Sequence, residues 1–376
     1  MAIKNFLLAL LPLACGESVF DKTMRNSGAN TFFERFFQNI EPAPNGKCNC
    51  AFFDMDGTII SAALISPVFA YQVRKSKFAF TSNSVDEVFG FMTASDQCRP
   101  KGQLPMKFGN QEIVVVFETV VFEIKNIFDA REQSENNARY LGGLIAVWDK
   151  FAFSYMQHQD RKSKCDYLST TIRYRLLHGI NTKDREKLML AVLKEEPKRG
   201  MYDDYMYDDV VVSIRTNIPA LYEEQKVLIN ELTARKVKSF VISTTPKEYL
   251  DTLITYFNIG INSAHANGSY PILKHHKTME AAVLAGSGHS NHESGKVDTM
   301  KWIAKEYGCI FLYASGDSMG DYEMVHEVLE HKGYALIQQG LPLDKNLLDL
   351  AKEKSYEGRV RIQNVNLEEA KWQKVV

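Results

Sequence analysis

The sequence lacks three features, and each absence excludes a class of protein. Neither sign of charge is in excess, because 45 Lys and Arg residues face 46 Asp and Glu residues. The composition therefore gives no electrostatic reason to expect a nucleic-acid partner. Beyond the N-terminus, no apolar run approaches the ~20 residues of a membrane-spanning helix, so no transmembrane segment is expected. No Cys-x-x-Cys pair occurs among the six cysteines, which argues against a thiolate zinc site.

What remains is the composition of a globular protein, with 45% hydrophobic and 24% charged residues. A chain of 376 residues is long enough for a core domain and a second sizeable unit. The sequence does not reveal the oligomeric state.

The first 16 residues resemble a secretory signal peptide. Lys4 precedes an apolar run over 6–14, and small residues follow up to Gly16. This pattern predicts export, to a periplasm or to the exterior, with cleavage after Gly16. The alternative is a helix that docks on the core of a cytoplasmic protein.

The cysteines leave the compartment open. Cys48 and Cys50 alternate along an expected strand, point to one face of it and have the pattern of structural residues. Cys98 and Cys165 can pair in an oxidising space, although the sequence alone does not establish the bond.

Short apolar runs that end in small or acidic residues predict a parallel sheet. Continuous runs of this kind are typical of strands that are buried on both faces. Amphipathic stretches that open at Pro219, Pro246 and Val297 predict helices between the later strands, and Gly308 is expected to end the last of them. The expected fold is therefore α/β, with a Rossmann-like, doubly wound parallel sheet. The three apolar runs are 50–53, 239–242 and 310–314.

About 185 residues separate the first two expected strands, far more than one crossover needs. We therefore expect an inserted, mostly helical cap domain over 66–215, and a catalytic core made of 17–65 and 216–376. Within the cap, 136–177 and 182–193 are expected to be mainly helical, and 112–117 is a possible strand.

The central motif is Asp54-Met-Asp-Gly-Thr58, directly after the first strand. Asp54 can attack phosphorus, and Asp56 can protonate the leaving oxygen and then activate water. Gly57 permits a tight backbone close to a phosphate. A calcium loop of EF-hand type is excluded, because positions 59 and 65 are both isoleucine where that loop needs Gly and Glu.

Further polar residues accompany the later strands. Asp317 is placed to ligate magnesium opposite Asp54, and Asp321 to support the metal or to orient a lysine. Lys296 opens a helix, where its ammonium group favours a phosphoryl anion. Ser243 can donate a hydrogen bond to a phosphoryl oxygen, and Thr244 is its competitor for that role.

These four pieces, in this order, resemble the haloacid dehalogenase (HAD) superfamily. The resemblance implies a Rossmann-like core, Mg²⁺ as the cofactor and an aspartyl-phosphate intermediate on Asp54. Residue by residue, it makes Asp54, Asp56, Ser243 and Lys296 catalytic. The carboxylates expected around the metal are those of Asp54, Asp56, Asp317 and Asp321. Asp56 favours phosphoester chemistry, because the dehalogenases of the superfamily lack a carboxylate at its position.

Two branches of the superfamily are similar to this chain. The segments 295–301 and 315–324 look like the phosphoserine phosphatase branch. The signal peptide, the aromatic helix expected over 31–40 and the tail over 358–365 look like the exported phosphorylcholine phosphatase group. The expected substrate is therefore a small phosphomonoester of phosphoserine or phosphorylcholine type.

Two further segments bear on ligands. The run over 201–209 is rich in tyrosine and aspartate, and Tyr205 with Asp204 can hold a cationic headgroup by cation–π contact and charge. The alternative is a solvated linker between cap and core. Five histidines lie between His265 and His292; they suggest a second metal site, but their polar surroundings favour a flexible loop.

The sequence thus predicts a Mg²⁺-dependent phosphomonoester hydrolase with a cap that closes over its substrate. Two alternatives stay open. One is a phosphotransferase or mutase of the same fold. The other is a catalytically silent HAD-like binding protein or secreted effector, for which Asp56 would have no use.

Overall fold

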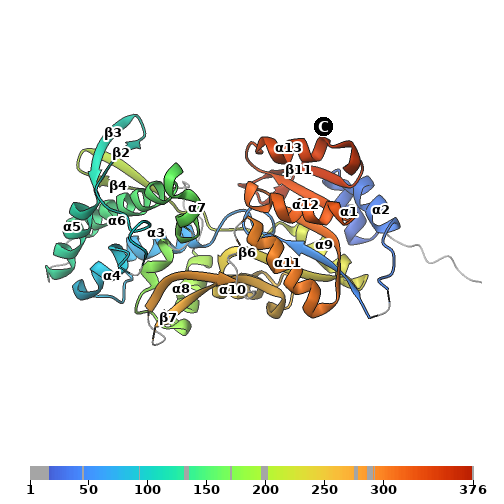
Figure 1. Ribbon diagram of the computed structural model, residues 1–376, viewed down its shortest axis with the longest axis horizontal. Helices are drawn as coiled ribbons and strands as arrows, with labels where there is room; N and C mark the ends of the chain where they lie inside the picture. The colour runs from blue at the N-terminus through green and yellow to red at the C-terminus, as the bar shows by residue number, and fades with distance from the viewer. Residues whose placement is uncertain are drawn as a thin grey trace, which may run out of the picture.

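The computed structural model has two lobes, shown side by side in Figure 1. One lobe is built on a large sheet, and the other consists of helices and two hairpins. The structure describes residues 17–44, 46–92, 94–130, 135–169, 172–195, 202–274, 278–285, 291 and 293–374.

The first lobe contains a sheet in the order β12-β11-β10-β9-β1-β6-β7-β8. The strands from β11 to β7 in this order are parallel, and β12 and β8 are antiparallel to their neighbours. The predicted α/β fold with a parallel sheet is therefore confirmed. The bounds are β1 (Cys48–Phe53), β6 (Lys238–Pro246), β7 (Ala266–Lys274), β8 (Thr278–Ala285), β9 (Cys309–Gly316), β10 (Tyr334–Gln339), β11 (Val360–Asn366) and β12 (Lys371–Trp372).

Both faces of this sheet are covered, which explains the continuous apolar runs. Phe52 and Phe53 are both fully buried, yet they belong to different hydrophobic clusters because successive side chains point to opposite faces. The covering helices are α1 (Val19–Asn26), α2 (Asn30–Gln38), α9 (Glu223–Ala234), α10 (Lys247–Phe257), α11 (Ser294–Tyr307), α12 (Tyr322–Glu330) and α13 (Lys345–Lys352).

The helix expected from Pro219 begins later than predicted. Helix α9 starts at Glu223, because the preceding residues pair with the chain after β1. Leu221 forms an isolated antiparallel bridge with Ile60, and the Ser61 amide donates to the Ala220 carbonyl at 2.8 Å. This pairing fixes the chain beside the loop that follows β1.

The second lobe is formed by the segment between β1 and α9. It has a separate hydrophobic cluster around Trp148 and Phe89 and a disulfide between Cys98 and Cys165. Its elements are α3 (Ile65–Lys75), α4 (Val85–Phe89), β2 (Gln103–Phe108), β3 (Gln111–Val116), α5 (Phe117–Asp129), α6 (Glu135–Met156), α7 (Gln159–Ser169), α8 (Thr182–Leu193), β4 (Tyr202–Tyr207) and β5 (Val210–Arg215).

This lobe contains more strand than the sequence predicted. The strand expected over 112–117 is β3, and it pairs with β2. The run over 201–209, interpreted as a headgroup site or a linker, supplies β4 of a hairpin with β5. We propose that this lobe is the inserted cap, and we keep 66–215 as its proposed bounds.

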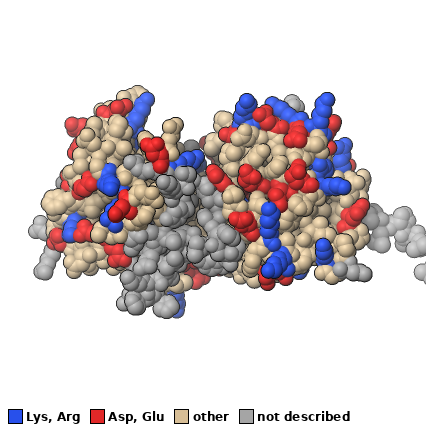
Figure 2. Space-filling model, viewed as in Figure 1, with Lys and Arg blue, Asp and Glu red and all other residues tan. Residues whose placement is uncertain are grey.

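The surface agrees with the balanced composition. On the face shown in Figure 2, acidic and basic side chains are mixed over both lobes. Within the part of the chain that the structure describes, no helix combines the length and the apolar character that crossing a bilayer requires.

Candidate active site

The two aspartate motifs meet because their strands are neighbours. Strands β1 and β9 are parallel, with Phe53 opposite Ser315, so both run out at the same edge of the sheet. The Asp54 amide donates to the Ser315 carbonyl at 3.0 Å. Asp54 and Asp317, far apart in the sequence, therefore lie at one site, where ligands bind in sheets of this type.

Lys296 lies between two of the carboxylates. Its Nζ donates to Asp54 Oδ1 at 2.8 Å and to Asp321 Oδ1 at 2.5 Å, and its side chain is almost fully buried. Burial opposes the charged ammonium, but Asp321 and Asp54 outweigh it and raise the pKa of Lys296 above its ordinary value. The lysine is therefore a fixed positive charge at the site.

Asp321 organises the turn after β9. Its Oδ2 accepts hydrogen bonds from the backbone amides of Asp317 and Ser318, at 3.0 and 3.1 Å, and from the Ser318 hydroxyl. A Cβ on Gly316 would overlap the Asp321 side chain, so glycine is needed for this close approach. The hydrogen bond from Lys296 supports one of the two roles predicted for Asp321, which is to orient the lysine.

Three carboxylates form a group that fits a divalent cation. One oxygen from each of Asp54, Asp317 and Asp321 lies within 4.8 Å of the others. Gly57 leaves the room for this arrangement, because a Cβ there would overlap the Asp317 carboxylate. Oxygen ligands of this kind suit Mg²⁺.

Burial and neighbouring carboxylates both disfavour the charged forms of the aspartates at this site. Burial raises the pKa of Asp54 to about 7; Lys296 opposes the rise, while Asp321 and Asp56 add to it. Burial, with Asp321 and Asp54, raises the pKa of Asp317 well above its ordinary value. One ammonium group does not neutralise this cluster, and a divalent cation would do so.

Asp56 faces a different partner from the other carboxylates. Its Oδ2 accepts a short hydrogen bond from Thr245 Oγ1, and its Oδ1 is buried without a hydrogen-bond partner. Burial raises its pKa, and the Thr245 hydroxyl opposes that rise. Its carboxylate does not belong to the group of three described above, which favours the proton-transfer role predicted for it over metal ligation.

The end of β6 supplies the hydroxyls. Ser243 is almost fully buried, and its Oγ accepts from the Thr245 amide at 3.2 Å. Thr244 is half-buried. The fully buried Asn291 donates to the Ser243 carbonyl at 3.1 Å and fixes the backbone there. Sequence reasoning did not identify Thr245, although it follows Ser243 and Thr244 in the same short motif.

Buried amides that sequence reasoning missed hold the loop after Asp56. Gln338, on β10, donates to the carbonyls of Gly57 and Thr58 at 2.8 and 2.6 Å. Its own Oε1 accepts from Trp372 Nε1 at 2.5 Å and from Gln225 Nε2 at 3.3 Å. A glutamine in an apolar strand is the signal that could have suggested a buried polar role.

A pocket of about 380 Å³ opens at this site. Asp56 and Asp317 line it on the core side, together with the 340–344 loop, and Arg215 from the end of β5 also lines it. The Nε of Arg215 is buried without a hydrogen-bond partner. An arginine in this state, beside the loop that follows β1, is available to bind an anion.

The structure does not bring Tyr205 and Asp204 to this pocket. Tyr205 is 9% exposed and packs in the hydrophobic cluster of the second lobe, where its ring lies against Gly142. Asp204 accepts from the Ser213 hydroxyl at 2.6 Å across the β4–β5 hairpin. Neither lines the pocket, so their headgroup role stays a prediction without support from this geometry.

The histidine-rich segment, for which the sequence favours a flexible loop over a second metal site, falls mostly outside the described residues. This applies to His275, His276, His289 and His292. His265 is described, and its ring lies against Phe240 at a centroid distance of 4.5 Å.

Comparison with known proteins gives matches at the level of structure. No protein-family model matches the chain, and no curated protein matches its sequence. A conserved functionally unknown protein from Anaerococcus prevotii DSM 20548 is similar, with 17% identity, a TM-score of 0.65 and coverage of 92% of this chain and 93% of that one.

Two looser matches have names that indicate an activity. A HAD family hydrolase from Salmonella enterica serovar Typhi has 13% identity, a TM-score of 0.37 and coverage of 87% of this chain and 74% of that one. A phosphoserine phosphatase structure with a phospho-aspartyl intermediate analogue has 14% identity, a TM-score of 0.33 and coverage of 78% and 87% in the same order.

Overlaps of this size assign no activity to the chain. The parallel sheet and the arrangement of the four motif pieces at its edge agree with the resemblance found in the sequence. The chain shares its overall fold with the functionally unknown protein from Anaerococcus prevotii.

Proposed function

We propose that the protein is a Mg²⁺-dependent phosphomonoester hydrolase that acts through an aspartyl phosphate on Asp54. The observation that carries the proposal is the position of Lys296, which joins Asp54 to Asp321 while Asp317 lies in the same group. A buried cluster of three carboxylates and one lysine, open to a pocket, suits the binding and transfer of a phosphoryl group.

Each residue then has a role. Asp54 attacks phosphorus, with its position fixed by the lysine and by its own backbone bond to β9. Asp56, with its raised pKa and one unpartnered oxygen, donates a proton to the leaving group and later takes one from water. Ser243, with Thr244 as the alternative, donates to a phosphoryl oxygen. Mg²⁺, held by Asp54 and Asp317, would offset the repulsion between the carboxylates and the phosphate.

The test is a phosphatase screen over small phosphorylated metabolites with Mg²⁺ and with EDTA. We expect phosphate release from the wild-type protein and none from Asp54→Asn. Asp349→Asn, which changes an exposed carboxylate on α13, is the matched control and should keep full activity. Radiolabel from a ³²P substrate should be retained on acid-quenched wild-type protein and be absent from Asp54→Asn.

The same screen separates the alternatives. Loss of the phosphoryl group from the substrate that requires an added alcohol, and yields the phosphoester of that alcohol in place of free phosphate, would indicate a phosphotransferase. Phosphoryl movement within the substrate would indicate a mutase. Inactivity toward every phosphoester in the presence of Mg²⁺ would contradict the enzyme and favour a binding protein or effector of this fold.

We further propose that the substrate has a second anionic group, which Arg215 binds. Arg215 reaches the pocket from the second lobe, and its buried Nε has no hydrogen-bond partner. The carboxylate of a phosphoserine-like substrate can pair with the Arg215 guanidinium, whereas the cationic headgroup of phosphorylcholine cannot. Because β5 carries Arg215, the contact would also hold the cap against the core.

Kinetics with matched substrates test this assignment. Loss of a charge-assisted hydrogen bond of about 1.5–3 kcal/mol corresponds to roughly a 10–150-fold loss in kcat/KM. We expect Arg215→Met to show that loss for phosphoserine and little change for phosphorylcholine. An equal loss for both substrates would contradict recognition of a second anion, while leaving the hydrolase proposal intact.

We also propose that the protein is exported. The disulfides Cys50–Cys309 and Cys98–Cys165 support this, because such bonds persist in oxidising compartments. The segment 1–16 lies outside the described residues. Fusion of 1–16 to a reporter enzyme that is active only after export would test the signal; absence of reporter activity would contradict it.

A further inference from the structure

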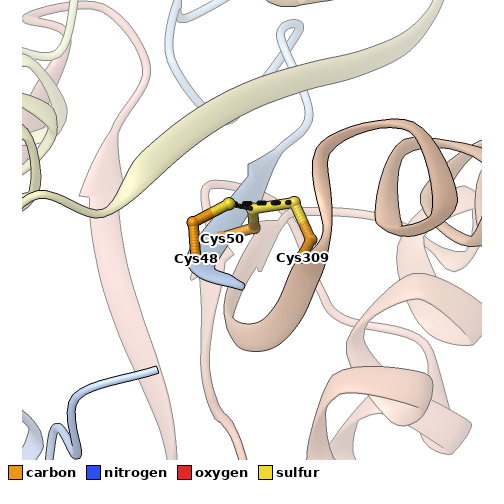
Figure 3. A group of neighbouring side chains, drawn as sticks. All are labelled: Cys48, Cys50 and Cys309. Carbon is orange, nitrogen blue, oxygen red and sulfur yellow. Dashed lines mark hydrogen bonds between the residues drawn. A yellow bond between two sulfur atoms is a disulfide. The ribbon is translucent and has the colours of Figure 1, made fainter. Parts of the chain in front are cut away.

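A third cysteine lies beside one of the disulfides. Cys50 on β1 is bonded to Cys309 on β9, at the opposite end of these strands from the aspartates. Cys48 Sγ lies 3.7 Å from Cys50 Sγ and 4.0 Å from Cys309 Sγ. Figure 3 shows the three side chains turned toward one another. Two of the three sulfur atoms are bonded to each other, so the group in this state does not offer three thiolates to a metal.

Cys309 has two geometrically suitable partners on β1. In the parallel ladder, Cys48 is the residue directly opposite Cys309, and adjacent strands lie about 4.8 Å apart. That spacing falls within the Cα–Cα range of disulfides, as does the 5.6 Å between Cys50 and Cys309. Cys48 and Cys50 point to the same face because they are two residues apart.

We propose that the three cysteines form a thiol–disulfide exchange site in which Cys309 alternates between Cys50 and Cys48. The Cys48 thiolate attacks Cys309 Sγ, a Cys48–Cys309 bond forms, the Cys50–Cys309 bond breaks, and Cys50 leaves as a thiolate that takes up the proton Cys48 lost. The number of disulfides is unchanged, so no oxidant or reductant is needed. The nearly equal sulfur distances place Cys48 beside the bond, and attack on Cys309 requires the Cys48 thiol to leave the Tyr307 carbonyl, to which it donates at 3.2 Å.

The exchange changes which thiol is accessible. Cys50 is fully buried, whereas Cys48 is partly exposed. A free Cys48 can therefore meet small thiol reagents, and a free Cys50 is protected by the core. In both isomers the starts of β1 and β9 remain linked, so either cysteine of β1 can maintain the bond.

Disulfide mapping tests the proposal. Purified protein is kept at pH 8, quenched with acid, alkylated under denaturing conditions and digested, and fragmentation locates the alkyl group on Cys48 or Cys50. We expect both isomers in the wild-type protein. Cys50→Ser should form Cys48–Cys309, and Cys48→Ser should hold only Cys50–Cys309.

The proposal requires both results. A wild-type protein that contains one isomer alone, or a Cys50→Ser variant in which Cys48 and Cys309 both stay free, would overturn it. The Cys98–Cys165 bond of the second lobe serves as an internal control, and it should be unchanged in every variant.

Discussion

Replacing Lys296 with methionine should destabilise the protein strongly, and more so at alkaline pH. Methionine keeps most of the side-chain volume and removes the ammonium that pairs with Asp54 and Asp321. Both carboxylates then stay buried without their counter-charge. Breaking a buried ion pair from one side costs about 3–5 kcal/mol.

The raised pKa of Asp54 sets the direction in which the stability of the folded state changes with pH. The folded-state pKa of Asp54 is raised above its ordinary value of 3.8, to about 7. Its proton therefore stabilises the folded state most below pH 3.8, and that contribution is lost as the pH rises toward 7. Lys296 opposes the rise of this pKa. Without Lys296, the pKa of Asp54 is higher still, and the loss of stability continues to a higher pH. The deficit of Lys296→Met should be larger at pH 8 than at pH 5.

Urea unfolding in EDTA at the two pH values measures the effect. Lys301→Met is the matched control, because Lys301 lies on the same helix, is 60% exposed and pairs with Glu327 at 3.4 Å. An exposed pair of this kind contributes about 0–1 kcal/mol. If Lys296→Met were no less stable than Lys301→Met at pH 8, the lysine would not be neutralising the carboxylates.

Three further predictions follow from the same contacts. Gly57→Ala should weaken Mg²⁺ binding about tenfold or more in calorimetric titration, because the new Cβ would overlap the Asp317 carboxylate and residue 57 has a positive φ of 78°. Unchanged affinity would contradict a metal site that needs the space left by Gly57. Mg²⁺ should raise the Tm more at pH 8 than at pH 5, because protons compete for Asp54 and Asp317, whose pKa values are raised; an equal rise would contradict metal binding by these carboxylates. Gly143→Ala should make the second lobe more sensitive to limited proteolysis, because its Cβ would overlap the Met206 carbonyl; unaltered cleavage would show that α6 can shift at no cost.

Local patterns determined the fold class and the chemical groups. The apolar runs were strands because both faces of the sheet are covered, and burial requires continuous hydrophobicity there. Asp54 and Asp317 could be placed from sequence, since polar residues after parallel strands meet at one edge. Gly308 ended α11 as expected, because it adopts the left-handed conformation with φ 64°.

Only the tertiary structure decided which side chains act on one another. Thr245 as the partner of Asp56, Gln338 as the support of the loop, and Arg215 in the pocket all depend on contacts between segments far apart in the chain. The pairing of Cys309 is of the same kind. Periodicity and spacing report the neighbours along one element, whereas these contacts are set by how strands and lobes pack, which no local pattern records.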